Sequence, residues 1–240
     1  MSGHETRAEL LSPAELDAAL VRAPIVYVPL GSLEFHGPHL PIGLDSLNAH
    51  GVCTAAAQRS GGIVLPVIYQ GIGGGHGDYP WSIMMAGATG LSAHLTTTLE
   101  RLEEFGVRTA VLFTGHFAPE QLDLVDEVAA AWNATDSELR VVGTGVNRCP
   151  DAPFRPDHAG VFESTLLYAL APDLVHVDLL PALVEHPAVD PDGDTYGPHR
   201  HDPDHPLWGV FGADPRPADF SRAAELLDHL GGWLAGLARA

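Results

Sequence analysis

Residues 24–45 read PIVYVPLGSLEFHGPHLPIGLD, an apolar run followed by a loop that carries several ionisable side chains. The β-branched residues of 24–30 predict a buried strand that ends at Gly31. Residues 45–59 follow the loop directly and have alanine and valine on one face, which predicts a helix. A strand, a polar loop and a helix in this order form the repeating unit of an α/β sheet.

The same alternation continues to the end of the chain. We expect further strands at 63–69, 107–114 and 139–146, and further helices at 13–21, 91–105, 119–132, 162–170 and from about 219 onward. This order favours an α/β fold in which a mostly parallel sheet has helices on both faces. Residues 181–217, rich in proline, aspartate, glycine and histidine, predict a long loop. Because no repeat or shift in composition divides residues 1–180, we interpret residues 1–240 as a single domain.

Composition excludes several classes of protein. The chain has 240 residues with 31 acidic and 12 basic side chains, a formal net charge of −19. All the basic residues are arginine, so neither a Walker-type phosphate loop nor a Schiff-base lysine is present. The negative charge disfavours nucleic acids and membrane surfaces as partners. No apolar run approaches the roughly 20 residues of a spanning helix and the start has no signal-peptide pattern, so we expect a cytoplasmic protein.

Histidine and cysteine indicate which metal chemistry is available. The chain has 14 histidines, more than average composition supplies, and imidazole is the commonest metal ligand in proteins. Cys53 and Cys149 lack CxxC spacing, which predicts buried thiols rather than a disulfide or a thiolate metal site.

The loop after the first strand carries a candidate metal site. Glu34 and His36 lie two residues apart, so both point to the same side of an extended segment. Asp45 opens the following helix, where the helix N-terminus stabilises a carboxylate. Carboxylate and imidazole together suit Zn²⁺ or Mn²⁺. The loop alone is equally compatible with a helix-capping aspartate, an exposed glutamate and a histidine bonded to a turn.

Two further loops carry candidates. His116 ends the apolar run 107–113, where it can complete a site begun at Glu34. His158 precedes a helix, and Glu163 lies in the first turns of that helix among apolar residues. A carboxylate there requires a metal, an arginine or a raised pKa. Taken alone, a histidine at a strand end is more often hydrogen-bonded than a metal ligand. Glu163 can likewise face solvent rather than the helix packing surface.

A glycine-rich segment, residues 71–80, holds His76, Asp78 and Tyr79. Its glycines resemble a phosphate-binding loop, but His76 occupies the position of the last glycine and no helix follows at once, so we reject a dinucleotide site. A rim that presents His76 or backbone amides to a substrate is the better interpretation. The absence of G-x-S-x-G disfavours the serine nucleophile of α/β-hydrolases.

Together these segments resemble the creatininase (creatinine amidohydrolase) family. The family's opening motif, G-S-x-E-Q-H-G-P-H-L-P-x-x-x-D, matches residues 31–45 except visibly at Phe35. Further motifs occur in the family's order: YQGIGGGHGDYP at 69–80, VRTAVLFTGH ending at 116, HAGVFES at 158–164 and VFGADP at 210–215. The resemblance therefore covers most of the chain.

The resemblance implies a three-layer α/β/α fold, assembly into homohexamers, and two divalent ions per chain. These would be Zn²⁺ or Mn²⁺, with Fe²⁺ possible, and a metal-bound hydroxide would hydrolyse a C–N amide bond. The implied metal ligands are Glu34, His36, Asp45, His116 and Glu163, with Asp45 as the bridge between the ions. The implied catalytic residues are His158 as proton donor, Glu163, and His76 as a group that orients the substrate. The expected substrate-binding residues are Gly74, Gly75, Asp78, Tyr79 and Phe117.

The chain departs from the family around residue 118. Creatininase has a metal-binding glutamate two residues after the histidine of its N-G-H motif, and this chain has Ala118. Three neighbouring positions also differ from the usual N-G-H-G-G-N: Thr114, Phe117 and Pro119. These differences indicate a divergent member whose substrate is not creatinine. We expect Glu163 to replace the missing ligand, with Glu120 as the alternative.

We therefore expect a metal-dependent amidohydrolase that acts on a small cyclic or linear amide. Two alternatives remain open: a catalytically silent metal-binding or scaffold member of the family, and a metallopeptidase or lactonase that uses the same site. The loop 185–205 contains several histidines: His186, His199, His201 and His205. We interpret it as a solvated surface loop rather than a lid, an intersubunit contact or an adventitious metal site.

Overall fold

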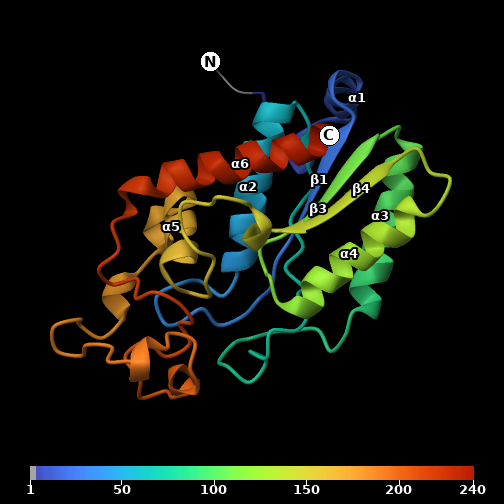
Figure 1. Ribbon diagram of the computed structural model, residues 1–240. Helices are drawn as coiled ribbons and strands as arrows, with labels where there is room; N and C mark the ends of the chain where they lie inside the picture. Colours follow the sequence, from blue (N-terminus) through green and yellow to red (C-terminus); the bar gives the residue numbers. More distant parts are fainter. Residues whose placement is uncertain (1–3) are drawn as a thin grey trace.

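The computed structural model describes residues 4–240 and contains a four-stranded parallel sheet (Figure 1). The first three residues of the predicted domain lie outside this description. The strands, in the order β2-β1-β3-β4, are β1 (Ile25–Leu30), β2 (Ile63–Val64), β3 (Thr109–Thr114) and β4 (Arg140–Gly145). All three pairings are parallel, and Ile25 of β1 aligns with Thr109 of β3. The predicted α/β class and parallel sheet are confirmed.

Helices cover both faces of this sheet and make three layers (Figure 1). One layer contains α1 (Pro13–Arg22), α3 (Thr89–Glu104) and α4 (Pro119–Asn133). The other contains α2 (Leu44–Ser60), α5 (Val161–Leu170) and α6 (Ala223–Arg239). Strand side chains alternate between the layers, so Val28 packs with α3 and α4 while Tyr27 packs with α2 and α6. The three-layer arrangement is therefore confirmed.

Local sequence explains where several helices begin and end. Ser12 and Glu15 cap the start of α1 reciprocally, and Glu15 Oε2 accepts the Ser12 backbone N–H at 2.8 Å. Gly61 ends α2 with a φ of 83°, a conformation that glycine adopts without strain. The last helix begins at Ala223 rather than near 219, because a short 3₁₀ turn occupies Phe220–Arg222.

The prediction of a strand over residues 63–69 is wrong beyond Val64, where β2 ends. Leu65 still donates its N–H to the Tyr27 carbonyl at 2.9 Å, but Ile68 rather than Val67 donates to the Pro29 carbonyl, at 3.0 Å, so one extra residue breaks the register with β1. The chain returns only for an isolated bridge between Leu30 and Ile68. The two paired residues are enough to place this segment at the edge of the sheet beside β1.

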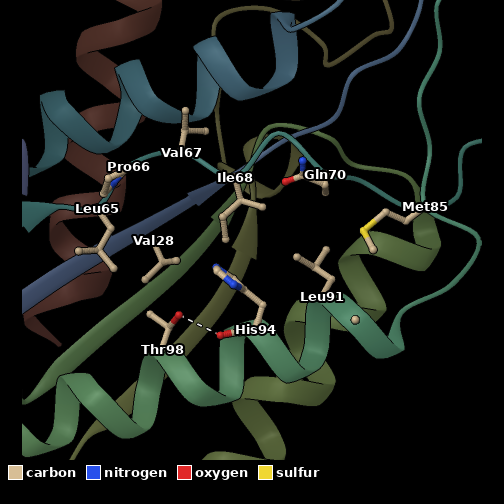
Figure 2. Close-up of a pocket in the computed structure, with 11 residues that line it drawn as sticks. Val28, Leu65, Pro66, Val67, Ile68, Gln70, Met85, Leu91, His94 and Thr98 are labelled. Carbon is tan, nitrogen blue, oxygen red and sulfur yellow. Dashed lines mark hydrogen bonds between the residues drawn. The ribbon is translucent and has the colours of Figure 1, made fainter. Parts of the chain in front are cut away.

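The segment that leaves the sheet forms one wall of an apolar pocket of about 550 Å³ (Figure 2). Leu65 and Ile68 face Leu91 and His94 of α3 across this pocket. No carboxylate lines it, and none of the predicted site residues does. Although it is larger than the pocket at the predicted site, it lacks the groups that the predicted chemistry requires.

Residues 181–217 form the predicted long loop, with only two short 3₁₀ turns, Pro191–Gly193 and Pro198–His201. The guanidinium of Arg200 is buried within this loop. Its Nε and Nη2 donate to the two carboxylate oxygens of Asp190 at 2.9 and 2.7 Å, and its Nη1 donates to the Val210 carbonyl at 2.7 Å. A buried ion pair therefore holds the loop together.

Two smaller expectations can also be compared with the structure. Cys53 and Cys149 are both buried and both free, as predicted. Within residues 4–240, we find no helix with the length and apolar character needed to span a membrane.

Candidate active site

The loops that follow β1 and β3 meet at the carboxyl end of the sheet. Gly115, after β3, donates its N–H to the Leu30 carbonyl at 2.9 Å, which holds the two strand ends together. A Cβ on Gly115 would lie 2.1 Å from the Asp45 carbonyl oxygen, so the first turn of α2 is pressed against β3. This close approach brings His116 beside Asp45, although 71 residues separate them.

Four of the predicted ligands form one buried cluster. His116 Nδ1 lies 3.0 Å from Glu34 Oε1 and 3.1 Å from Asp45 Oδ2. His36 Nε2 lies 3.1 Å from the other Asp45 oxygen, Oδ1. The two histidines therefore face opposite oxygens of one carboxylate, and none of the four side chains has appreciable exposure.

Glu163 joins the cluster from α5. Its Oε2 lies 3.6 Å from His36 Nε2 and accepts the Ala159 N–H at 2.6 Å. The side chain is buried, so the solvent-facing alternative is wrong. Asp157 accepts the backbone N–H groups of Gly160 and Phe162 at 3.2 and 3.1 Å, which fixes the turn that leads into this helix.

His76 and His158 close the other side of Glu34. His76 Nδ1 is 3.3 Å from Glu34 Oε2, and His158 Nδ1 is 3.7 Å from Glu34 Oε1. The His158 ring stacks on the His36 ring with centroids 4.4 Å apart. Its Nε2 donates to the Phe35 carbonyl at 3.1 Å, so the lone pair of Nδ1 faces the cluster.

Backbone carbonyls orient the imidazole rings of His36 and His116 in the same way as that of His158. His36 Nδ1 donates to the Glu34 carbonyl at 3.0 Å, and His116 Nε2 donates to the Ile72 carbonyl at 3.1 Å. Each histidine thus turns its remaining nitrogen toward the carboxylates. This pattern, in which one ring nitrogen bonds to the backbone and the other points inward, is typical of histidines that bind metal.

A pocket of about 230 Å³ opens beside the cluster. It is lined by Glu34, Asp45, Gly74, His76, His116, Phe117, Ala118, Pro119, His158 and Glu163. Of the predicted substrate-binding residues, Gly74 and Phe117 therefore line it, whereas Gly75, Asp78 and Tyr79 do not. Tyr79 instead has its Oη 2.6 Å from Nδ1 of His201 in the 181–217 loop.

Glu120, the alternative to Glu163, is held away from the cluster. Its Oε2 accepts the Gly74 N–H at 3.3 Å, and a Cβ on Gly73 would lie 2.2 Å from that oxygen. Gly74 itself faces His116 and Ala118 on its other side. The backbone of the glycine segment thus stands between Glu120 and the cluster, and among residues 4–240 no group of possible metal ligands includes Glu120.

The spacing of ionisable residues does not reveal Ser32, which also belongs to the site. Its hydroxyl donates to Asp45 Oδ2 at 2.7 Å and is fully buried. Ser32 lies within the GSLE motif, which is the one sequence signal that could have indicated it.

Burial and ion pairing shift the pKa values of the cluster in opposite directions. Burial opposes ionisation of Glu34 and Asp45, but the neighbouring histidines outweigh it, lowering the pKa of Glu34 to about 2 and that of Asp45 well below its usual range. Burial likewise disfavours charge on His36, yet Asp45 and Glu163 raise its pKa to about 10. Burial raises the pKa of Glu163 and lowers the pKa of His158. The cluster therefore concentrates negative charge that protons or bound cations must balance.

The donor set fits divalent metal ions. The three buried carboxylates have only histidines as salt-bridge partners within the described chain. In the described part of the chain, three sets of side chains in the cluster offer ligand atoms that lie within 4.8 Å of one another: Glu34, His36 and Asp45; His36, His158 and Glu163; and Glu34, His76 and His158. A fourth set, outside the cluster, is Asp190, His199 and His205 in the 181–217 loop. Carboxylate oxygens and imidazole nitrogens at this density suit Zn²⁺ or Mn²⁺.

The chain matches the model of one known family over nearly its whole length. The model of the family described as creatininase, creatinine amidohydrolase, matches residues 9–238, and the chain belongs to this family. A creatinine amidohydrolase of Pseudomonas putida is 29% identical over 184 residues, 68% of this chain and 69% of that protein. A mycofactocin precursor peptide peptidase of Mycolicibacterium smegmatis is 32% identical over 166 residues, 65% of this chain and 62% of that protein.

Solved structures share the fold. A crystal structure of creatinine amidohydrolase superimposes with a TM-score of 0.77 and 25% identity, covering 98% of this chain and 96% of the other. Creatininase structures described as a Zn-Zn type and as Mn forms align with TM-scores of 0.73 and 0.72 over 98% of this chain and 97% and 98% of theirs. At 22% and 24% identity, these two show the common fold alone.

Proposed function

We propose that the chain is an amidohydrolase that depends on two divalent ions, Zn²⁺ or Mn²⁺. The observation that carries the proposal is the position of Asp45, whose two oxygens face His36 and His116 separately. A carboxylate in this position can bridge two ions. The choice of metals follows two creatininase structures with this fold, one described as a Zn-Zn type and one as an Mn form.

The ligands divide into two groups that share Asp45. Glu34 and His116 would hold one ion, and His36 and Glu163 the other. When bound, the ions would polarise the scissile carbonyl and lower the pKa of water so that it attacks near neutral pH. In this proposal Glu163 supplies the carboxylate ligand that Ala118 cannot provide. Glu120 does not bind an ion, because its carboxylate accepts the Gly74 N–H of the glycine segment.

His158 is the proton carrier in this proposal. Burial lowers its pKa, so it is neutral, and its free Nδ1 faces the cluster. A neutral imidazole accepts a proton when water attacks and then donates that proton to the leaving nitrogen. His76 and the Gly74 amide line the same pocket and would orient the substrate carbonyl.

The pocket favours a small substrate. Its volume of about 230 Å³ suits a compact cyclic or linear amide, and Phe117, Ala118 and Pro119 form an apolar wall. The similarity to a precursor peptide peptidase supports a second candidate, hydrolysis at the end of a peptide. A lactonase or a catalytically silent metal-binding scaffold would retain the same cluster.

Elemental analysis combined with a substrate panel tests the proposal. We expect about two ions per chain and turnover of at least one amide from a panel of cyclic amides, linear amides, short peptides and lactones. Asp45→Asn should lose both ions, whereas Asp78→Asn, an exposed carboxylate outside the pocket, should keep them. A wild-type chain that binds no metal contradicts the proposal, and two ions without turnover favour the scaffold.

A cytoplasmic location and a homohexameric assembly remain predictions. Light scattering of the purified chain measures its mass in solution, and a mass other than six chains contradicts the predicted hexamer.

A further inference from the structure

Gln121, in the first turn of α4, lies where three loops of the active site begin. Its side chain is fully buried. Its Oε1 accepts the Ile72 N–H at 2.9 Å, and its Nε2 donates to the Gly31 carbonyl and to Thr114 Oγ1, both at 3.0 Å. The amide thus makes one bond to the start of each loop that carries Glu34, His76 or His116, and all its polar hydrogens are used.

Two of these bonds continue to His116. The Thr114 hydroxyl donates to the His116 carbonyl at 2.6 Å, and the Ile72 carbonyl accepts from His116 Nε2 at 3.1 Å. The backbone and the ring of His116 are therefore both held by groups that Gln121 binds. Because Nε2 donates to a backbone carbonyl, Nδ1 is the ring nitrogen that faces Glu34 and Asp45.

We propose that Gln121 is a positioning residue for the active site, acting through Ile72 and Thr114 to fix the ring orientation of His116. It touches neither the pocket nor any carboxylate of the cluster. A buried amide with every bond satisfied is rigid, because breaking one bond leaves a polar group without a partner. The effect on an ion rests on the proposed function, whereas the effect on Ile72 and Thr114 does not.

Gln121→Met tests this role, because methionine has a similar volume and cannot form the three bonds. In the metal-free chain we expect faster hydrogen exchange of the Ile72 amide, measured by mass spectrometry. In competition with a chelator we expect Zn²⁺ to bind about 10- to 100-fold more weakly, the usual effect of losing a group that orients a ligand.

Asn133 provides the matched control at the other end of α4. Its side-chain amide donates to the Val141 carbonyl at 2.7 Å and accepts the Val141 N–H at 2.9 Å, far along the helix from the site. Asn133→Leu removes a comparable pair of bonds, and it should leave both Ile72 exchange and Zn²⁺ affinity unchanged. An equal loss of Zn²⁺ affinity in both variants would mean that Gln121 acts only on overall stability.

The outcomes separate this inference from the proposed function. Unchanged Ile72 exchange and unchanged Zn²⁺ affinity in Gln121→Met overturn the inference and leave the proposed function standing. Faster Ile72 exchange with no Zn²⁺ bound by the wild type supports the positioning of the loop and contradicts the proposed function. Should Gln121→Met not fold, Thr114→Val removes only the hydroxyl, and wild-type Zn²⁺ affinity in that variant overturns the inference.

Discussion

At the residue scale, the carboxylate of Asp45 is the most heavily shared group in the site. Its Oδ1 faces His36, and its Oδ2 accepts from Ser32 and faces His116. Since it starts α2, the helix N-terminus also favours its negative charge. A carboxylate held from four directions has a fixed orientation.

His158→Ala should separate proton transfer from metal binding. We expect turnover to fall by about 10²- to 10⁴-fold, the usual contribution of a general acid or base. Metal content should be unchanged, because the Nδ1 of His158 lies 3.7 Å from Glu34 and the other ligands remain in contact with one another. Steady-state kinetics and elemental analysis measure the two effects.

The control for this variant is His94→Ala, an exposed histidine of α3 that should retain full activity. Loss of an ion from His158→Ala would show that His158 is a ligand and that another group carries the proton.

At the scale of elements, the site depends on how closely α2 approaches two strand ends. A Cβ at Gly31 would lie 2.2 Å from the Ser46 backbone nitrogen, and one at Gly115 would lie 2.1 Å from the Asp45 carbonyl oxygen. Only glycine permits backbone to meet backbone at these distances. The start of α2, and with it Asp45, is therefore placed by two glycines that directly follow the neighbouring strands β1 and β3.

Gly115→Ala should displace Asp45 and weaken metal binding. Both partners of the clash are backbone atoms, so the added methyl group forces the strand and the helix apart. We expect a destabilisation of about 1–3 kcal/mol, as for other overpacked sites, together with a loss of bound metal. Urea unfolding and elemental analysis measure these effects.

Gly236→Ala is the matched control, because it adds the same methyl group where nothing lies within 4 Å. Within helix α6, replacing glycine by alanine should stabilise the chain by about 1 kcal/mol and leave its metal content unchanged. Full metal binding by Gly115→Ala would contradict the dependence on close approach.

At the scale of the whole molecule, the 181–217 loop packs against segments that carry residues of the site. Tyr79 of the glycine segment has its Oη 2.6 Å from His201 Nδ1 of this loop, and the Phe35 ring lies 4.7 Å from the Trp208 ring. The loop has little regular structure, and the ion pair of Asp190 and Arg200 ties two of its segments together.

Asp190→Asn should destabilise the chain in a manner that depends on pH. Arg200 lowers the pKa of Asp190 from 3.8 to about 2 in the folded state, so folding favours the ionised carboxylate. The ionised carboxylate of Asp190 therefore stabilises the fold at pH values above about 4, and this contribution is lost as the pH falls through the folded pKa. The difference in unfolding free energy between wild type and variant should be largest near pH 7 and shrink below pH 3.

Urea unfolding at several pH values measures this difference, with the exposed Asp192→Asn as control. A destabilisation that stays constant down to pH 2 would exclude the ion pair as its cause.

Removing metal should lower the melting temperature of the whole chain. Ions that bind only the folded state stabilise it by about 2.7 kcal/mol when present at a hundredfold excess over their Kd. For a chain of 240 residues this corresponds to roughly 5–10 °C. Calorimetry before and after chelation measures the shift in melting temperature. The Asp45→Asn variant should show no shift. A wild-type melting temperature that is the same with and without the chelator contradicts the metal site.

Much of the fold followed from the sequence, because the periodicity of apolar residues is a local property. The order of strands and helices, the capping box at Ser12 and the glycine end of α2 needed only neighbouring residues. The strand predicted for 63–69 ends at Val64, because one extra residue before Ile68 breaks the register with β1, and an apolar run alone does not reveal such a break.

The sequence by itself determined the candidate residues of the site, through motifs in which Glu34, His36 and Asp45 lie close along the chain. Only the tertiary structure decided that His116 meets Asp45, that Glu163 rather than Glu120 joins the cluster, and that Gln121 binds the three loops. These contacts span up to 90 residues of sequence. They depend on how two helical layers pack against one sheet, which no local spacing specifies.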